Sequence, residues 1–142
     1  MPNYYVNEAA FALPEKGFAD RTLHRLESPL ADTEPMGLEI RRVALEPGKS
    51  LRQLVDAEVA ATKLKVNGFT IVEDVELPID GAPAIVLRAR LRALDMPYYQ
   101  RQAHVAFEKT WLSFIVTGPF AERATCDQTF ERIVHSLAWR RD

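Results

Sequence analysis

The sequence lacks the features that mark several large classes of protein. Its 142 residues contain a single cysteine, Cys126, so no intrachain disulfide can form and nothing indicates an oxidising compartment. No apolar run approaches the roughly 20 residues that cross a bilayer. The N-terminus has no basic segment followed by an apolar one, which a secretory signal requires. We therefore expect a cytoplasmic protein with no direct membrane insertion.

An excess of charge of one sign is also missing. Lys and Arg number 18 and Asp and Glu number 20, for a formal net charge of −2, so no basic field attracts nucleic acid. The sequence contains no GxGxxG, GxxxxGK[ST], CxxC or HExxH motif, and its histidines stand apart at positions 24, 104 and 135. We expect no cofactor, no metal site and no nucleic-acid partner.

What is present is a globular composition with room for one domain, spanning residues 1–142. Ser50 suits an N-cap, and apolar residues at helical spacing predict a helix over 51–66 that ends at Asn67-Gly68. A second helix is predicted over 121–137, behind Pro119. Strands are expected over 4–13, 18–27, 37–45, 69–77, 84–94, 98–109 and 111–116.

The order βββ-α-ββββ-α predicts an α+β domain, a curved antiparallel sheet with both helices on one face. Asp80-Gly81 carries a hairpin signal, and Asp95-Met96-Pro97 predicts a second reversal. In the strand over 84–94, the apolar alternate set (Ile85, Leu87, Ala89 and Leu91) is expected to face the helices. In the strand over 98–109, the set Tyr98, Gln100, Gln102, His104 and Ala106 is expected to line an open face, where function could lie.

Four features allow two interpretations each. His24 and His104, with a carboxylate such as Glu39, could form an acid–base pair, or could be histidines tolerated on a half-exposed sheet. Cys126 could be a reactive thiolate or a packing residue. The alternating arginines could bind an anion, or could be a solvated face paired across the strands with residues such as Glu73; they are Arg88, Arg90 and Arg92. Trp111 and Trp139 suit either a core or an interface.

Several short segments resemble the Eag chaperones of type VI secretion, which belong to the DcrB-related group of PsbP-like folds. These segments are Tyr4-Tyr-Val-Asn-Glu8-Ala, Phe11-Ala-Leu-Pro14, Asn67-Gly-Phe69, Ile79-Asp-Gly81-x-Pro-Ala84 and Arg101-Gln102. The resemblance implies a cytoplasmic homodimer that holds the N-terminal transmembrane segments of an effector protein before the effector is loaded onto the secretion spike.

The resemblance also implies which residues line the effector-binding groove on the concave face of the sheet. They are Thr22, His24, Glu39, Glu58, Val66, Tyr98 and Gln102. Val66 and Gln102 keep the pattern of the family, whereas Thr22, His24, Glu39 and Glu58 are more polar than it. If Gln102 lies in a surface groove, Gln102→Ala should weaken client capture and leave the melting temperature almost unchanged.

Two other functions fit the sequence. One is a DcrB/PsbP-like interaction protein with a different partner. The other is an NTF2-like enzyme that uses His24 or His104, although that fold usually opens with helices and three predicted strands come first here. A gene encoding an effector with N-terminal transmembrane helices beside the gene for this chain would favour the chaperone.

Overall fold

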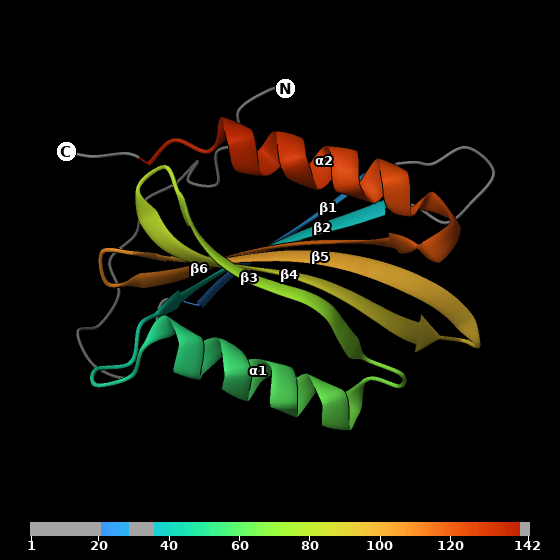
Figure 1. Ribbon diagram of the computed structural model, residues 1–142, viewed down its shortest axis with the longest axis horizontal. Helices are drawn as coiled ribbons and strands as arrows, with labels where there is room; N and C mark the ends of the chain where they lie inside the picture. The colour runs from blue at the N-terminus through green and yellow to red at the C-terminus, as the bar shows by residue number, and fades with distance from the viewer. Residues whose placement is uncertain (1–20, 29–35, 140–142) are drawn as a thin grey trace.

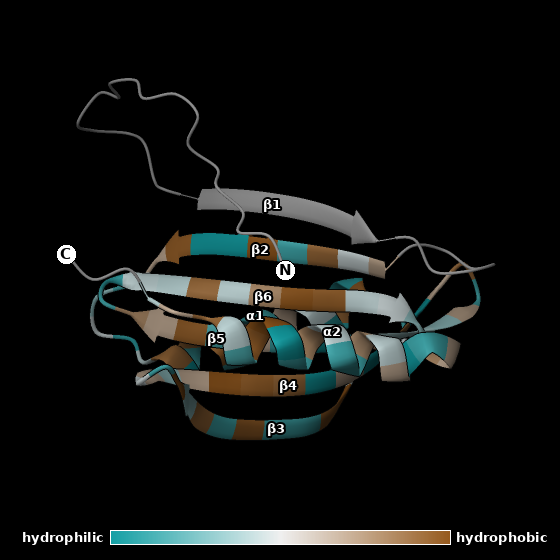
Figure 2. Ribbon diagram, turned by 90° about the horizontal axis from the view of Figure 1, so that it is seen from above, coloured by the Kyte–Doolittle hydropathy of each residue, from teal (hydrophilic) through white to brown (hydrophobic). Residues whose placement is uncertain are grey.

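The computed structural model describes residues 36–139 and, as backbone only, residues 21–28. The strand expected over 4–13 lies outside these residues. The described strands form one antiparallel sheet in the order β1-β2-β6-β5-β4-β3 (Figures 1 and 2). Their bounds are β1 Arg21–Ser28, β2 Met36–Ala44, β3 Thr70–Ile79, β4 Ala82–Ala93, β5 Met96–Phe107 and β6 Thr110–Pro119. The predicted α+β class and antiparallel sheet are confirmed.

Helix α1, Leu51–Lys65, begins where the sequence predicts. The Ser50 side chain accepts a hydrogen bond from the Gln53 amide, and the Gln53 side chain accepts one from the Ser50 amide, which forms a capping box. The helix ends before Gly68, which has a φ of 69°. It buries Leu54 and Val55, and Val55 packs with Ile85 and Leu87 of β4.

Helix α2, Arg123–Ser136, follows a short 3₁₀ turn at Phe120–Glu122. It buries Cys126, Phe130 and Ile133 against a larger core on the other face of the sheet. A Cβ at Gly118 would lie 2.6 Å from Cys126 Sγ, so only glycine lets helix and sheet approach this closely. Burial raises the pKa of the Cys126 thiol to about 11, which favours the packing interpretation of this residue.

The two helices lie on opposite faces of the sheet, with α2 above and α1 below in Figure 1. The expectation that both helices cover one face is therefore wrong. The reason lies in β4, where Ala84 and Val86 join the α2 core while Ile85 and Leu87 join the α1 cluster. A strand with consecutive apolar residues needs a cover on both faces.

Three tight turns join the last four strands. Asp80 and Gly81 have φ values of 47° and 82°, which is the hairpin turn predicted for Asp-Gly. The second turn lies at Leu94 and Asp95, with φ values of 51° and 62°, one residue before the predicted reversal. The third contains Glu108, whose φ is 56°, inside a segment predicted to remain a strand up to Lys109. Neither Leu nor Glu favours a positive φ, so these two residues did not indicate where the turns lie.

Candidate functional site

The face of the sheet that α1 covers carries an ionic cluster beside the helix. Arg41 of β2 places Nε 2.6 Å from Glu39 Oε1 and Nη1 2.7 Å from Glu58 Oε1 of α1. Burial alone would lower the pKa of Arg41, but the hydrogen bond and charge of Glu39, with the charge of Glu58, hold this pKa above its ordinary value. Two carboxylates of the predicted groove are thus paired with a cation of the protein itself.

A chain of hydrogen bonds crosses the same face. The Trp111 indole N–H donates to His104 Nδ1 at 3.1 Å, so the hydrogen of the neutral imidazole is on Nε2, which donates to Gln102 Oε1 at 2.7 Å. Gln102 Nε2 donates to Gln100 Oε1 at 2.5 Å, and Gln100 Nε2 donates to Thr117 Oγ1 at 3.0 Å. Each member of this chain, from Trp111 to Thr117, is oriented by the one before it.

His104 is buried and neutral. Burial, reinforced by the charge of Arg41, lowers its pKa to about 4. Ser113 Oγ also lies 3.0 Å from Nδ1, so protein groups contact both ring nitrogens. A general base should titrate near the working pH and reach its substrate. The geometry of His104 supports the structural interpretation of this residue.

The predicted groove residues do not share one face. Paired residues on neighbouring antiparallel strands belong to the same face. His24 pairs with Ile40, which packs in the α2 core, and Thr22 pairs with Arg42. Glu39 occupies the alternate position, on the α1 side with Arg41 and Glu58. The proposed pairing of His24 with Glu39 is therefore not supported by the register.

The remaining predicted residues lie on or near the α1 side. Val66 caps the C-terminus of α1, and Tyr98 begins the pairing of β5 with β6, opposite Pro119. Gln102 is only 7% exposed, and both ends of its amide are hydrogen-bonded. Gln102 therefore occupies no surface groove, and its amide is not free to bind a client. The expectation of an open face is wrong here, because α1 covers the amphipathic set of β5.

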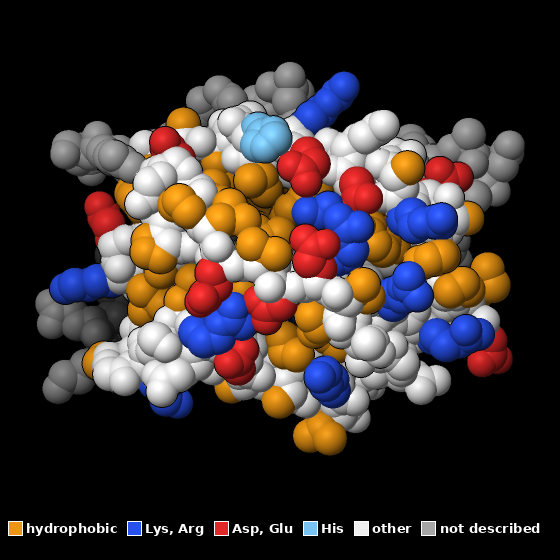
Figure 3. Space-filling model, viewed as in Figure 1, with side chains coloured by type: hydrophobic (Ala, Val, Ile, Leu, Met, Phe, Trp, Pro, Cys, Tyr) orange, Lys and Arg blue, Asp and Glu red, His pale blue; other side chains and the backbone are white. Residues whose placement is uncertain are grey.

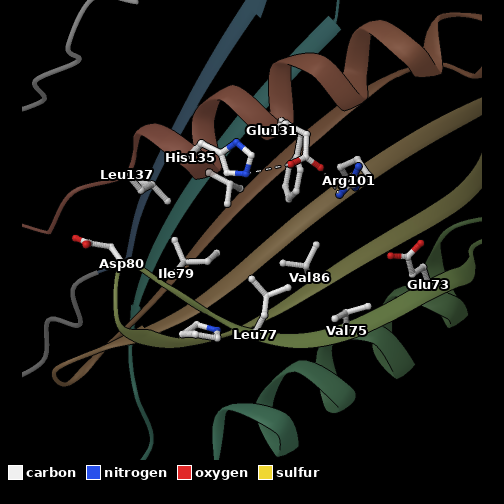
Figure 4. Close-up of a pocket in the computed structure, with 13 residues that line it drawn as sticks. Glu73, Val75, Leu77, Ile79, Asp80, Val86, Arg101, Glu131, His135 and Leu137 are labelled. Atoms are coloured by element: carbon white, nitrogen blue, oxygen red, sulfur yellow. Dashed lines mark hydrogen bonds and ion pairs between the residues drawn. The ribbon is translucent and has the colours of Figure 1, made fainter.

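A groove that the sequence did not reveal lies on the other face, between α2 and the edge strand β3. It encloses about 600 Å³. Figure 4 shows Val75, Leu77 and Ile79 projecting from β3 toward α2, and Figure 3 shows hydrophobic side chains gathered between these elements. Its apolar lining consists of Val75, Leu77, Pro78, Ile79, Val86, Phe130, Val134 and Leu137. Val75 and Leu77 remain exposed, which leaves an apolar surface for a partner.

Arg101 lies at the base of this groove and fastens α2 to β5. Its Nη1 lies 2.7 Å from Asp127 Oδ1, its Nη2 lies 3.3 Å from Glu131 Oε1, and its guanidinium lies 4.3 Å from the centre of the Phe130 ring. The hydrogen bonds that Tyr99 and Arg101 donate to Asp127 outweigh burial and lower the pKa of that carboxyl. Burial and the bond to Asp127 raise the pKa of Tyr99 to about 12.

The rim of the groove is mostly acidic. Glu73 and Asp80 of the β3 side and Glu131 of α2 line it, together with His135. The single arginine of the lining, Arg101, is already paired with Asp127 and Glu131. The alternation of Val75, Leu77 and Ile79 was visible in the sequence, but nothing there showed that β3 is an edge strand beside a helix.

The three alternating arginines have separate environments. Arg88 Nε lies 3.7 Å from Glu73 Oε2, as the cross-strand interpretation expects. Arg90 lies over the ring of Phe120, and Arg92 packs against Gly68. Among the residues that the structure describes, no cluster of His, Cys, Asp or Glu could hold a metal ion. None of the described helices is long and apolar enough to span a bilayer.

Solved structures with a similar fold include proteins from three bacteria. A Pseudomonas aeruginosa protein of unknown function, PA94, described as a putative regulator, is 16% identical with a TM-score of 0.82 over 98% of this chain and 96% of its own. Mycobacterium tuberculosis LpqN, involved in cell envelope biogenesis, is 10% identical with a TM-score of 0.60 over 86% of this chain and 85% of its own. These likenesses establish the shared fold.

The third is the PsbP protein CyanoP of Synechocystis sp. PCC 6803, which is 10% identical with a TM-score of 0.57 over 89% of this chain and 96% of its own. The fold is therefore PsbP-like. No curated protein matches the sequence significantly. The DcrB family model matches residues 8–136, nearly the whole sequence. The chain belongs to the DcrB family.

Proposed function

We propose that this DcrB-family protein is a non-catalytic chaperone that shields the N-terminal transmembrane segments of a type VI secretion effector in the cytoplasm. The observation that carries the proposal is the groove between α2 and β3, where exposed Val75 and Leu77 flank a hollow of about 600 Å³. An apolar segment in water needs an apolar surface of this kind to prevent aggregation. The resemblance to Eag chaperones supplies the identity of the client.

The acidic rim favours a client with basic flanks. Transmembrane segments often carry Lys or Arg on the side that stays in the cytoplasm. Such residues, beside an apolar segment lying on Leu77, would meet Asp80 at one end of the groove and, at the other end, Glu73, which also pairs with Arg88 at 3.7 Å. Because carboxylates lie at both ends, charge would add attraction without selecting a direction, and the apolar floor would supply most of the affinity.

The dimensions favour a homodimer. The helical wall of the groove runs from Phe130 to the end of α2 at Ser136, about 10 Å of helix, whereas a transmembrane segment of about 20 residues is about 30 Å long. One groove covers less than half of such a segment. Two copies of the chain would cover most of it, as the resemblance implies.

A DcrB-family interaction protein with a different partner is the alternative, and co-expression separates the two. The full chain is co-expressed with the product of the neighbouring gene and captured by a tag. We expect an effector with N-terminal transmembrane helices to be captured, and Leu77→Glu to reduce its capture at least ten-fold. Val72→Glu is the matched control, because Val72 is exposed on the same strand but does not line the groove.

Equal loss of capture in both variants would contradict the assignment of the groove. Capture of an effector that has no apolar N-terminal segment would contradict the chaperone function and favour the alternative. Light scattering at the mass of one chain, 16.1 kDa, at micromolar concentration would exclude the homodimer.

A further inference from the structure

One end of the molecule carries cationic side chains together with apolar side chains that are exposed to solvent. It lies where α1 ends, where β4 turns into β5 and where α2 begins, on the right in Figure 1. We call this end the basic tip; it consists of Lys63, Leu64, Lys65, Arg90, Arg92, Leu94, Met96 and Arg123. Leu94 is 92% exposed, Leu64 is 89% exposed and Met96 is 57% exposed.

Direct contacts join the three segments of the basic tip. The Arg92 amide donates to the Asn67 carbonyl at 2.9 Å, which ties the end of β4 to the end of α1. The guanidinium groups of Arg90 and Arg123 lie 5.0 Å and 4.5 Å from the centre of the Phe120 ring, which ties β4 to the start of α2. Figure 3 shows Lys and Arg side chains among hydrophobic ones at this end.

The turn at the basic tip has a backbone conformation that lowers the stability of the fold. Leu94 has a φ of 51°, a conformation that suits Gly or Asn and is rare for a bulky residue. The turn therefore holds a large apolar side chain in water on a strained backbone. Strain of this kind, combined with exposure, is typical of a functional position.

The charge of the basic tip is largely uncompensated. Neither Lys63 nor Lys65 pairs with a carboxylate in the described part of the chain, and Arg90 and Arg123 lie against an aromatic ring. Asp95 and Glu122 are the acidic residues of the same segments, and Arg92 Nη2 bonds the backbone carbonyl of Asp95, not its carboxylate. Cations therefore exceed carboxylates at this end of a chain whose net charge is −2.

We propose that the basic tip binds the surface of an anionic lipid bilayer. Cations attract anionic headgroups, while single apolar side chains at a turn enter the boundary between headgroups and acyl chains. We favour a bilayer over an acidic protein, because single exposed apolar side chains beside lysines and arginines match the boundary between headgroups and acyl chains. In this arrangement the protein lies on the bilayer, and none of the helices that the structure describes crosses it. The proposal is independent of the α2–β3 groove.

Flotation of the full chain with lipid vesicles tests the proposal. The wild-type protein is expected to float with vesicles of phosphatidylcholine and phosphatidylserine, and not with phosphatidylcholine alone. Leu94→Gly should reduce binding about ten-fold and should leave the melting temperature unchanged or higher, because Gly accepts the positive φ. The double variant Lys63→Glu and Lys65→Glu should reduce binding by roughly ten-fold or more.

The matched control is the double variant Lys49→Glu and Lys109→Glu, which makes the same change of charge at the opposite end of the molecule. Lys109 lies in the turn between β5 and β6, where its carbonyl accepts a hydrogen bond from the Leu45 amide at 2.9 Å. Lys49 lies in the loop between β2 and α1, four residues after Leu45. An equal loss of binding in this control would show that binding depends on net charge alone, which would overturn the proposal. The proposal would also be overturned if the wild-type protein did not float with anionic vesicles, even if the tip variants changed the capture of a protein.

Discussion

The two faces of the sheet bury their side chains by different means. On the α2 face, apolar residues such as Phe130 and Val116 form a large core, and this core stays open at one edge as a groove. On the α1 face, a small apolar cluster at Val55 adjoins a chain of hydrogen bonds through His104 and Gln102. A polar strand face is therefore not necessarily a binding face. The polar groups of the α1 face hydrogen-bond to one another under the helix, whereas the α2 face keeps apolar side chains exposed to solvent.

The largest effect is expected on the α2 face. Phe130 is almost fully buried and packs against Arg101, so Phe130→Ala should lower the free energy of unfolding by about 3–5 kcal/mol. Urea unfolding of the full chain measures this change. Leu64→Ala is the control, since an exposed leucine should change that free energy by less than about 0.5 kcal/mol. A similar loss in both variants would contradict the location of the core.

The second largest expected effect is a pH dependence of stability that arises from His104 on the α1 face. The pKa of His104 is about 4 in the folded protein and about 6.5 when unfolded, so between these values the unfolded chain binds more protons. Stability should therefore fall as the pH falls from about 6.5 to about 4, by up to about 3 kcal/mol from this residue. Histidine NMR signals recorded against pH measure the transition directly. A His104 signal that titrates near pH 6.5 would show that the ring is not buried.

Replacement of Gln102 should cause a smaller loss of stability. Its loss in Gln102→Ala leaves His104 Nε2 and Gln100 Oε1 without their partner, which should cost about 1–3 kcal/mol of stability. The melting temperature should therefore fall, while capture of a client by the α2–β3 groove stays unchanged. An unchanged melting temperature with weakened capture would restore the expectation, drawn from the sequence, of a surface groove at this residue.

The smallest effect is expected at the ionic cluster. Glu58 and Arg41 are both substantially exposed to solvent, so Glu58→Gln should lower stability by less than about 1 kcal/mol, and by less still at high salt. Thermal unfolding at two salt concentrations measures this. A loss of several kcal/mol would mean that the cluster is a buried part of the fold.

Local signals predicted most of the elements. Ser50 and Asn67-Gly68 placed α1 within a residue or two of Leu51–Lys65, and Asp80-Gly81 placed a hairpin turn where the structure has one. These signals depend on neighbouring residues alone. The turns at Leu94 and Glu108 were misplaced, because the residues there do not favour the conformation that the chain adopts.

The arrangement of the elements was harder to predict. Each helix has an apolar face, but nothing in that pattern shows which side of the sheet it covers. Ala84-Ile85-Val86-Leu87 was the signal that both sides are covered, since both alternate sets are apolar. The groove depends on β3 being an edge strand, a long-range property that alternation does not encode. Gln102 and His104 looked available because the sequence did not show that α1 covers their face or that Trp111 of β6 donates to His104.

Amide hydrogen exchange of the full chain, alone and in the co-purified complex with its client, shows which face of the sheet binds the client. Exchange should slow on client binding in β3 around Val75 and Leu77 and in α2 around Val134, the elements that line the groove. Amides of α1 and of β5 around Gln102 should exchange at the same rate in both samples. Slower exchange confined to α1 and β5, with β3 and α2 unchanged, would contradict the account and place the client on the face that it regards as structural.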